Sequence, residues 1–175
     1  LISIKNNKEK IYNCLPVHHV NAGILSFYAS LLSGNCQIQA ERFSIKNFWN
    51  HIKYSNATIF HYLGIMVPLL FKQNVSQCDL KSNLRLGVGA GIEPEFHYKF
   101  EKKFKIPMVE LWGMTEIVRC IYDNKKNRQI GKRCFGKPDS SLETKVIDIN
   151  GKNVVNKQGE LLVRNSDRTP KKGFF

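Results

Sequence analysis

Three side chains of different chemistry lie at residues 112–116, directly after an apolar stretch at 108–111. Trp112 offers a flat ring on which a base can stack, and Thr115 offers a hydroxyl that can donate to a phosphate oxygen. Glu116 offers a carboxylate, a ligand that Mg²⁺ takes together with substrate phosphates. A purely structural interpretation competes with this one, in which the tryptophan belongs to the core and the threonine caps a helix.

A glycine-rich stretch at 84–94 has the pattern of a strand that runs through a loop into a helix. Such a turn lets the backbone approach a nucleotide closely. Gly87 and Gly89 match two positions of the dinucleotide fingerprint G-x-G-x-x-G, but the third position is Ile92. Glu110 lies 21 residues after Gly89, about where a ribose-binding acid is found in that fold. An incomplete fingerprint and a plain tight turn both remain open.

The elements that must position these residues alternate between strand and helix patterns. A repeat of Phe96, Phe100 and Phe104 after Pro94 predicts a helix whose phenylalanines face the core. We expect strands at 10–15, 57–61, 84–88 and 108–111, and helices at 20–32, 43–52, 65–71 and from 93 onward. The helix at 43–52 is expected to begin at Ser44 as its N-cap, and Gly34 is expected to end the helix at 20–32. This order predicts an α/β fold with a mainly parallel sheet flanked by helices.

The pattern changes after Pro138. Residues 142–149, a turn at Asn150 and Gly151, and residues 159–164 indicate antiparallel strands. We therefore predict two units, an α/β unit at 1–138 and the first strands of a small β-barrel at 139–175.

The net charge of the chain is +13, from 27 Lys and Arg against 14 Asp and Glu. Such a charge invites a nucleic-acid or anionic-surface interpretation. The positive residues are scattered, however, whereas a nucleic-acid footprint concentrates them with aromatic residues. We interpret them mainly as a solvated surface and expect no nucleic-acid partner, and we keep a stand-alone basic binding module as the alternative from a different class.

The five cysteines are odd in number and never form C-x-x-C, so the sequence favours neither a zinc site nor a disulfide framework. The longest apolar stretch, 22–32, is far shorter than the roughly 20 residues of a membrane span, so we predict no transmembrane segment. We expect a cytoplasmic protein with reduced thiols.

Five segments resemble, in the same order, motifs of the adenylate-forming superfamily, which contains acyl-CoA synthetases, luciferases and the adenylation domains of peptide synthetases. Residues 15–19 resemble L-P-x-x-H, 89–92 resemble G-A-x-P, 111–116 resemble Y-G-x-T-E, 131–138 resemble G-x-x-G-x-P, and 159–164 resemble G-E-L-x-V-R. Within the superfamily, residues 41–44, 48–49, 57–58 and 113–116 are most similar to the carnitine- and crotonobetaine-CoA ligase branch.

The resemblance implies a ligase that uses ATP, Mg²⁺ and coenzyme A, and that acts on a small-molecule carboxylate in fatty acid or carnitine metabolism. The carboxylate would be activated as an acyl adenylate with loss of pyrophosphate and then transferred to the thiol. The chemistry is electrostatic, because charge on the α-phosphate must be neutralised as the carboxylate attacks it.

The resemblance also implies roles for single residues. Trp112 takes the place of the usual tyrosine over adenine, and Glu116 is the magnesium ligand. Thr115 contacts phosphate, so Thr115 and Glu116 are the candidate catalytic residues. The remaining candidates are nucleotide contacts at Gly89, Ala90, Gly91, Ile92, Gly113 and Met114, and acyl-pocket residues at His19 and Gly113.

Two family features are absent from the sequence. No Ser/Thr/Gly-rich phosphate loop precedes residue 15, and the chain lacks the C-terminal domain that carries the adenylation lysine. We therefore expect the 175 residues to be an internal fragment that does not turn over alone. An adenylation domain that serves a carrier protein is the alternative within the superfamily.

Overall fold

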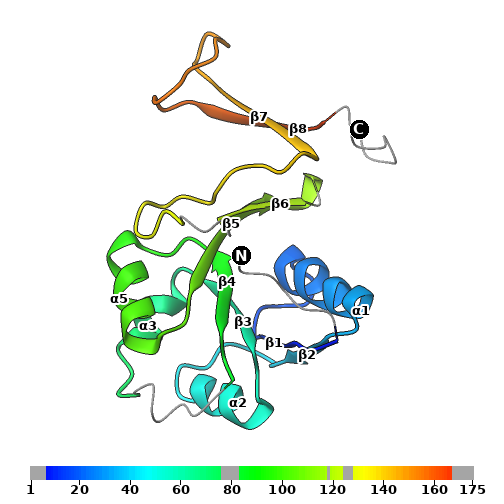
Figure 1. Ribbon diagram of the computed structural model, residues 1–175, viewed down its shortest axis with the longest axis vertical. Helices are drawn as coiled ribbons and strands as arrows, with labels where there is room; N and C mark the ends of the chain where they lie inside the picture. Colours follow the sequence, from blue (N-terminus) through cyan, green and yellow to red (C-terminus); the bar gives the residue numbers. More distant parts are fainter. Residues whose placement is uncertain (1–6, 76–82, 118, 124–127, 167–175) are drawn as a thin grey trace.

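The structure is a computed structural model that describes residues 7–75, 83–117, 119–123 and 128–166. Its main feature is a six-stranded sheet with the order β2-β1-β3-β4-β5-β6 (Figure 1). Strands β1 to β5 are parallel to their neighbours, and β6 is antiparallel to β5. The strands are β1 (Lys10–Asn13), β2 (Cys36–Gln39), β3 (Ile59–Leu63), β4 (Leu86–Ala90), β5 (Met108–Met114) and β6 (Arg119–Tyr122). The predicted α/β fold with a mainly parallel sheet is confirmed.

Helices lie on both sides of this sheet. Figure 1 shows α3 and α5 on one side of the strands and the η1–α1 helix on the other. The η1–α1 helix is π-helical in its first part and ends at Gly34, as predicted, where the φ of +66° is the left-handed conformation common at helix ends. The helices are η1 (Asn21–Tyr28), α1 (Ala29–Ser33), α2 (Phe48–Ser55), α3 (Met66–Phe71), α5 (Pro94–Phe104) and the 3₁₀ turn η2 (Thr115–Ile117).

Alternating side chains of the strands build two cores, as expected for a sheet covered on both faces. Tyr12 and Phe60 belong to the larger core, which they share with residues of α2, α3 and α5. Ile11 and Ile59, their neighbours in the chain, belong to a smaller core with Leu86 and Val109. All of these side chains are buried.

The start of α2 differs from the prediction. The helix begins at Phe48 rather than near Ser44, and Ser44 closes the turn before it. The Ser44 carbonyl accepts the N–H of Phe48 at 2.9 Å, and its hydroxyl accepts the N–H of Asn47 at 3.3 Å. The apolar spacing still identified the buried side, since Phe48, Trp49 and Ile52 all lie in the core.

Strand β5 is longer than predicted. It continues through Met114 instead of ending at residue 111, because its last residues pair with β6, a strand that the sequence analysis did not predict. Trp112 pairs with Ile121 and Gly113 with Cys120. Two further strands, β3 and β4, each begin two residues later than predicted.

Strands β7 (Leu142–Ile147) and β8 (Glu160–Asn165) form a separate antiparallel ladder, as predicted for this part of the chain. Asn150 and Gly151 do form a turn, in which the N–H of Gly151 donates to the Asp148 carbonyl at 3.0 Å. That turn does not join the two strands directly, because β8 begins only at Glu160. The division at residue 138 stays a prediction, and residues 167–175 of the second unit lie outside the described residues.

None of the described helices is long and apolar enough to cross a membrane.

Candidate functional site

Two of the predicted ligand-binding segments meet at the carboxyl ends of β4 and β5. These strands are parallel neighbours, and Gly89 pairs with Glu110. The loop at residues 90–92 begins at Ala90, the last residue of β4, and Trp112 lies two residues beyond Glu110 on β5. The carboxyl edge of a parallel sheet is where ligands bind in α/β proteins. The topology therefore brings the predicted nucleotide loop beside the strand that carries the predicted base-stacking residue.

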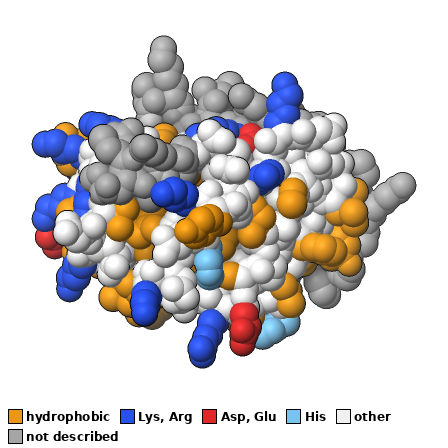
Figure 2. All heavy atoms as spheres, turned by 90° about the horizontal axis from the view of Figure 1, so that it is seen from below, with side chains coloured by type: hydrophobic (Ala, Val, Ile, Leu, Met, Phe, Trp, Pro, Cys, Tyr) orange, Lys and Arg blue, Asp and Glu red, His pale blue; other side chains and the backbone are white. Residues whose placement is uncertain are grey.

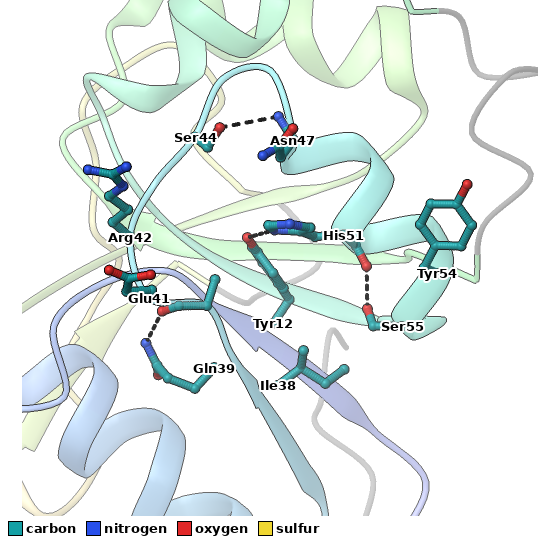
Figure 3. A pocket seen from close by; sticks show the side chains of 11 residues that line it. Tyr12, Ile38, Gln39, Glu41, Arg42, Ser44, Asn47, His51, Tyr54 and Ser55 are labelled. Atoms are coloured by element: carbon teal, nitrogen blue, oxygen red, sulfur yellow. Dashed lines mark hydrogen bonds between the residues drawn. The ribbon is translucent and has the colours of Figure 1, made fainter.

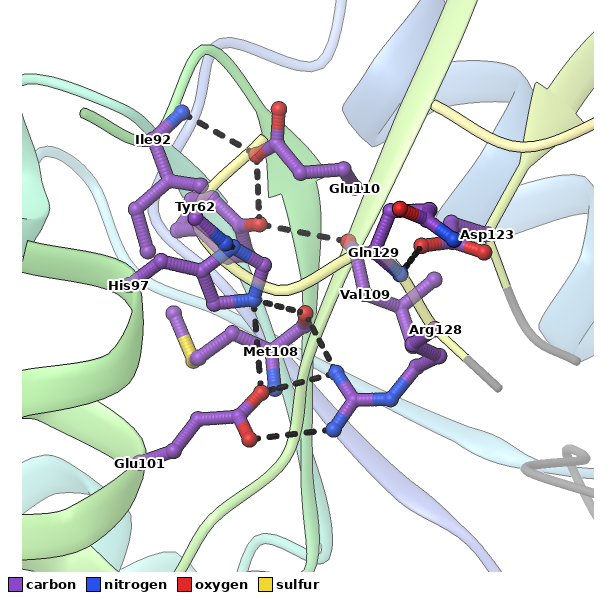
Figure 4. Close-up of polar contacts among 11 residues, drawn as sticks. Tyr62, Ile92, His97, Glu101, Met108, Val109, Glu110, Asp123, Arg128 and Gln129 are labelled. Atoms are coloured by element: carbon purple, nitrogen blue, oxygen red, sulfur yellow. Dashed lines mark hydrogen bonds and ion pairs between the residues drawn. The ribbon is translucent and has the colours of Figure 1, made fainter. Parts of the chain in front are cut away.

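Glu110 connects the two segments. Its side chain is buried, and its carboxylate accepts the backbone N–H of Ile92 at 3.0 Å and that of Gly91 at 3.2 Å. The hydroxyl of Tyr62 on β3 donates to the same carboxylate at 2.8 Å (Figure 4). Both carboxylate oxygens therefore already accept hydrogen bonds within the chain. This arrangement does not fit an acid that binds the hydroxyl groups of a ribose.

The glycines of the incomplete dinucleotide fingerprint have another use. Gly87 and Gly89 lie within β4 rather than in a loop. A Cβ at Gly87 would lie 2.5 Å from the Met108 sulfur and 2.9 Å from the Phe60 ring, and one at Gly89 would lie 2.1 Å from the Tyr62 carbonyl oxygen. These glycines make room for the neighbouring strands β3 and β5, so the dinucleotide interpretation does not fit the structure.

Within this stretch, position 91 requires glycine because its φ of +80° is a conformation that other residues rarely adopt. The turn that it forms packs directly on Gly64, which follows β3. The N–H of Gly64 donates to the carbonyl of Ala90 at 2.8 Å. A Cβ at Gly64 would lie 1.7 Å from the carbonyl oxygen of Gly91, so the loop is in backbone contact with the end of β3.

Trp112 lies on β5 and is half-buried. Its ring stacks on Phe135, with ring centroids 5.8 Å apart and an interplanar angle of 29°. Phe135 comes from the segment at 131–138 that was singled out in the sequence, so two of the predicted motifs touch here. The neighbouring Gly113 packs on β6, where a Cβ would come 2.9 Å from the Cys120 sulfur.

Met114, Thr115 and Glu116 are exposed at the end of β5 and the start of η2. Among the described residues, no group of three or more His, Cys, Asp or Glu side chains converges on one point. Mg²⁺ is commonly held by one or two carboxylates together with substrate phosphates. The single exposed carboxylate of Glu116 fits that kind of donor set.

His19 does not lie beside the strands that carry the other candidate residues. It follows β1, is exposed, and lies against His18 with ring centroids 4.5 Å apart. Because β3 separates β1 from β4, the predicted acyl-pocket histidine lies at the same edge of the sheet but not at the same strands.

A different histidine, His61 on β3, is fully enclosed. Burial lowers its pKa to about 4, so the ring is neutral. Its Nδ1 lies 2.5 Å from the side-chain oxygen of Asn21 at the start of η1. A single histidine in a strand carries no distinctive sequence pattern, so its contact with Asn21 could not be predicted.

A buried ion pair fastens the segment after β6 to the rest of the sheet (Figure 4). Arg128 donates to both oxygens of Glu101 on α5, at 2.7 and 3.0 Å, and to the carbonyl of Met108 at 2.9 Å. His97 contacts the same carbonyl at 3.0 Å. Burial alone would raise the pKa of Glu101, but hydrogen bonds from His97, Arg128 and the Met108 N–H lower it to about 2.

An open cavity of about 670 Å³ lies elsewhere, between α2 and the β1–β2 edge of the sheet (Figure 3). On one wall the Tyr12 hydroxyl lies 3.0 Å from Nδ1 of His51. None of the residues predicted to bind a ligand lines this cavity. It is separate from the β4–β5 edge, because β3 stands between β1 and β4 in the sheet.

Several known proteins are similar to this chain in sequence or in fold. The bovine long-chain fatty acid transport protein 1 (Bos taurus) is 29% identical over 128 residues, which are 73% of this chain and 20% of that protein. A long-chain-fatty-acid-CoA ligase from Archaeoglobus fulgidus superposes with a TM-score of 0.75 at 19% identity, over 91% of this chain and 35% of that one. ATP-bound MatB from Rhodopseudomonas palustris gives 0.75 at 17% identity, over 91% and 32%.

The chain spans about a fifth of the length of the curated relatives it matches. At these identities the solved structures show the fold alone. The sequence model of the family described as AMP-binding enzyme matches residues 2–170, nearly the whole chain. The chain therefore belongs to the AMP-binding enzyme family.

Proposed function

We propose that this chain is part of an ATP-dependent acyl-CoA ligase. The enzyme converts a carboxylate and ATP into an acyl adenylate and pyrophosphate, and then transfers the acyl group to coenzyme A. The observation that carries the proposal is the order of the candidate residues along β5. Glu110 pairs with Gly89 beside the 90–92 loop, and Trp112, Thr115 and Glu116 follow further along β5 and into η2.

In this proposal the nucleotide lies over the carboxyl end of β4 and β5. Trp112 stacks on the adenine, with its ring already held against Phe135, and the backbone at 89–92 forms the adjoining wall. Thr115 donates its hydroxyl to a phosphate oxygen. Glu116 holds Mg²⁺, which supplies positive charge beside the phosphates as charge develops there. Gly113 borders the acyl group, and His19 belongs to the acyl side of the site.

The substrate class that we propose first is a long-chain fatty acid. Its support is the similarity to a long-chain fatty acid transport protein, together with the shared fold of a long-chain-fatty-acid-CoA ligase. The resemblance to the carnitine- and crotonobetaine-CoA ligase branch stays a prediction. A panel of fatty acids of increasing length, with carnitine and crotonobetaine included, separates the two substrate classes.

The test is pyrophosphate exchange into ATP, measured on the full-length protein that carries this segment. We expect exchange that depends on the carboxylate and on Mg²⁺. Glu116→Gln should lower it about 100-fold, because a preorganised electrostatic contact is typically worth 10²–10³ in rate.

Glu95→Gln is the matched control, since Glu95 is an exposed carboxylate on α5, where it pairs with Lys99. Exchange at the wild-type rate in Glu116→Gln contradicts the magnesium assignment. No carboxylate-dependent exchange in the wild-type protein contradicts the proposed function itself.

A further inference from the structure

Glu110 is a buried carboxylate whose charge is met by hydrogen-bond donors rather than by a cation. It is 5% exposed, and no ion pair joins it to another described residue. Burying a charge is costly unless polar partners satisfy it. Three donors do so: the backbone N–H groups of Gly91 and Ile92 and the hydroxyl of Tyr62.

The three donors divide between the two oxygens. Oε1 accepts from Tyr62 at 2.8 Å and from Ile92 at 3.0 Å, and Oε2 accepts from Gly91 at 3.2 Å. Tyr62 remains a donor, because burial and then the neighbouring charge of Glu110 raise its pKa well above the usual value. The carboxylate therefore needs both oxygens as acceptors, a requirement that an amide cannot meet.

The loop itself is held from two sides. The Glu110 carboxylate accepts hydrogen bonds from the N–H groups of Gly91 and Ile92. On the other side, the N–H of Gly64 donates to the carbonyl of Ala90 at 2.8 Å. Those two N–H groups point into the protein, so they are not free to bind phosphate. The loop can therefore contact a ligand only through the rest of its surface, and its conformation is fixed by the hydrogen bonds to Glu110 and from Gly64.

We propose that Glu110 is a positioning residue for the nucleotide, an inference that rests on the proposed function. Its carboxylate holds the 90–92 loop in the conformation that contacts adenine, and it does so without touching the nucleotide. The binding of ATP depends on this carboxylate through the loop, whereas the binding of the carboxylate substrate does not.

Glu110→Gln is the direct test. The glutamine has the same shape, but it replaces one acceptor oxygen by an NH₂ group that faces an N–H donor, so one loop hydrogen bond is lost. We expect the KM for ATP in pyrophosphate exchange to rise about tenfold, with the KM for the carboxylate unchanged. Without nucleotide, backbone hydrogen exchange in a peptide covering 89–93 should be about tenfold faster than in the wild-type protein.

Glu9→Gln is the matched control. Glu9 is also a buried carboxylate, but it pairs with Arg85 and accepts from the Thr58 hydroxyl at the amino end of the sheet. Its loss should lower stability and leave both the KM for ATP and the exchange of the loop unchanged. Glu110→Asp is a milder second variant for use if Glu110→Gln does not fold, because it keeps both oxygens on an arm one carbon shorter.

An unchanged KM for ATP in a folded Glu110 variant overturns the proposal, and so does an unchanged rate of hydrogen exchange in the loop. A rise in KM that Glu9→Gln reproduces overturns it as well, since general destabilisation would then be the cause. Failure of the proposed function gives a different result. The wild-type protein would then show no pyrophosphate exchange, while hydrogen exchange at 89–93 would still be faster in Glu110→Gln.

Discussion

Arg128 donates to Glu101 through Nη1 and Nη2 of its guanidinium group, at 2.7 and 3.0 Å, across 27 residues of sequence. The pair is largely buried, with side-chain exposures of 12% and 15%. Through it the segment after β6, which leads to Phe135, is fastened to α5. Since Phe135 stacks on Trp112, this ion pair supports one side of the proposed nucleotide site.

The protein should lose stability in acid through Glu101. Its pKa in the folded protein is about 2, below the ordinary 4.5, so its contribution is present above pH 4.5 and is lost as the pH falls toward 2. Glu101→Gln should lower the free energy of unfolding at pH 7 by about 3 kcal/mol, because it also leaves Arg128 without its charge partner. Chemical denaturation at pH 7 and pH 3 measures both effects.

Glu95→Gln is the control for that experiment, since Glu95 is an exposed carboxylate on the same helix. It should remain close to the wild-type protein at both pH values. A Glu101→Gln protein whose stability falls between pH 4.5 and pH 2 as steeply as the wild type would show that other groups control the acid sensitivity.

The sequence predicted those parts of the fold that have a local pattern. The phenylalanine repeat after Pro94 identified α5, and Phe100 and Phe104 are indeed buried, while Phe96 packs at the margin of the core. The edge strand β2 was missed because it is only four residues long and none of its residues is buried, so it lacks the apolar run that marks an inner strand. The ion pair between Arg128 and Glu101 has no local pattern at all, because it exists only once the chain has folded.

The same distinction applies to the candidate site. That the 90–92 loop and Trp112 would be neighbours follows from the parallel order of strands, because the carboxyl ends of such strands share one edge. The role of Glu110 could not be predicted, since sequence spacing alone suggested an acid that faces a ribose. Only the folded chain shows its carboxylate engaged by backbone N–H groups.

Gly64→Ala should disturb the loop without straining residue 64 itself. The added Cβ would lie 1.7 Å from the oxygen and 2.2 Å from the carbon of the Gly91 carbonyl, both backbone atoms that cannot rotate away. We expect a loss of about 1–3 kcal/mol in the free energy of unfolding and faster hydrogen exchange at 89–93.

Gly151→Ala is the comparison variant for Gly64→Ala. Gly151 has a φ of +75°, and a Cβ there would meet nothing within 4 Å. This change should cost roughly 1 kcal/mol through backbone strain and leave the exchange of the loop as it is. Equal hydrogen exchange at 89–93 in the two variants would argue against close packing of Gly64 on the loop.

The stack of Trp112 on Phe135 should contribute to nucleotide binding, if Trp112 is the adenine platform that we propose. Phe135→Ala removes the ring that supports one face of the indole, and an aromatic pair is typically worth about 0.5–1.5 kcal/mol beyond its buried area. We therefore expect the Kd for AMP to rise roughly two- to tenfold, measured by titration calorimetry on the full-length protein. Phe96→Ala is the matched control, because Phe96 on α5 pairs edge-to-face with Phe71 at the end of α3 at a similar centroid distance, 5.7 Å. Equal effects of the two substitutions on the Kd would place the cause in general stability rather than in the support of Trp112.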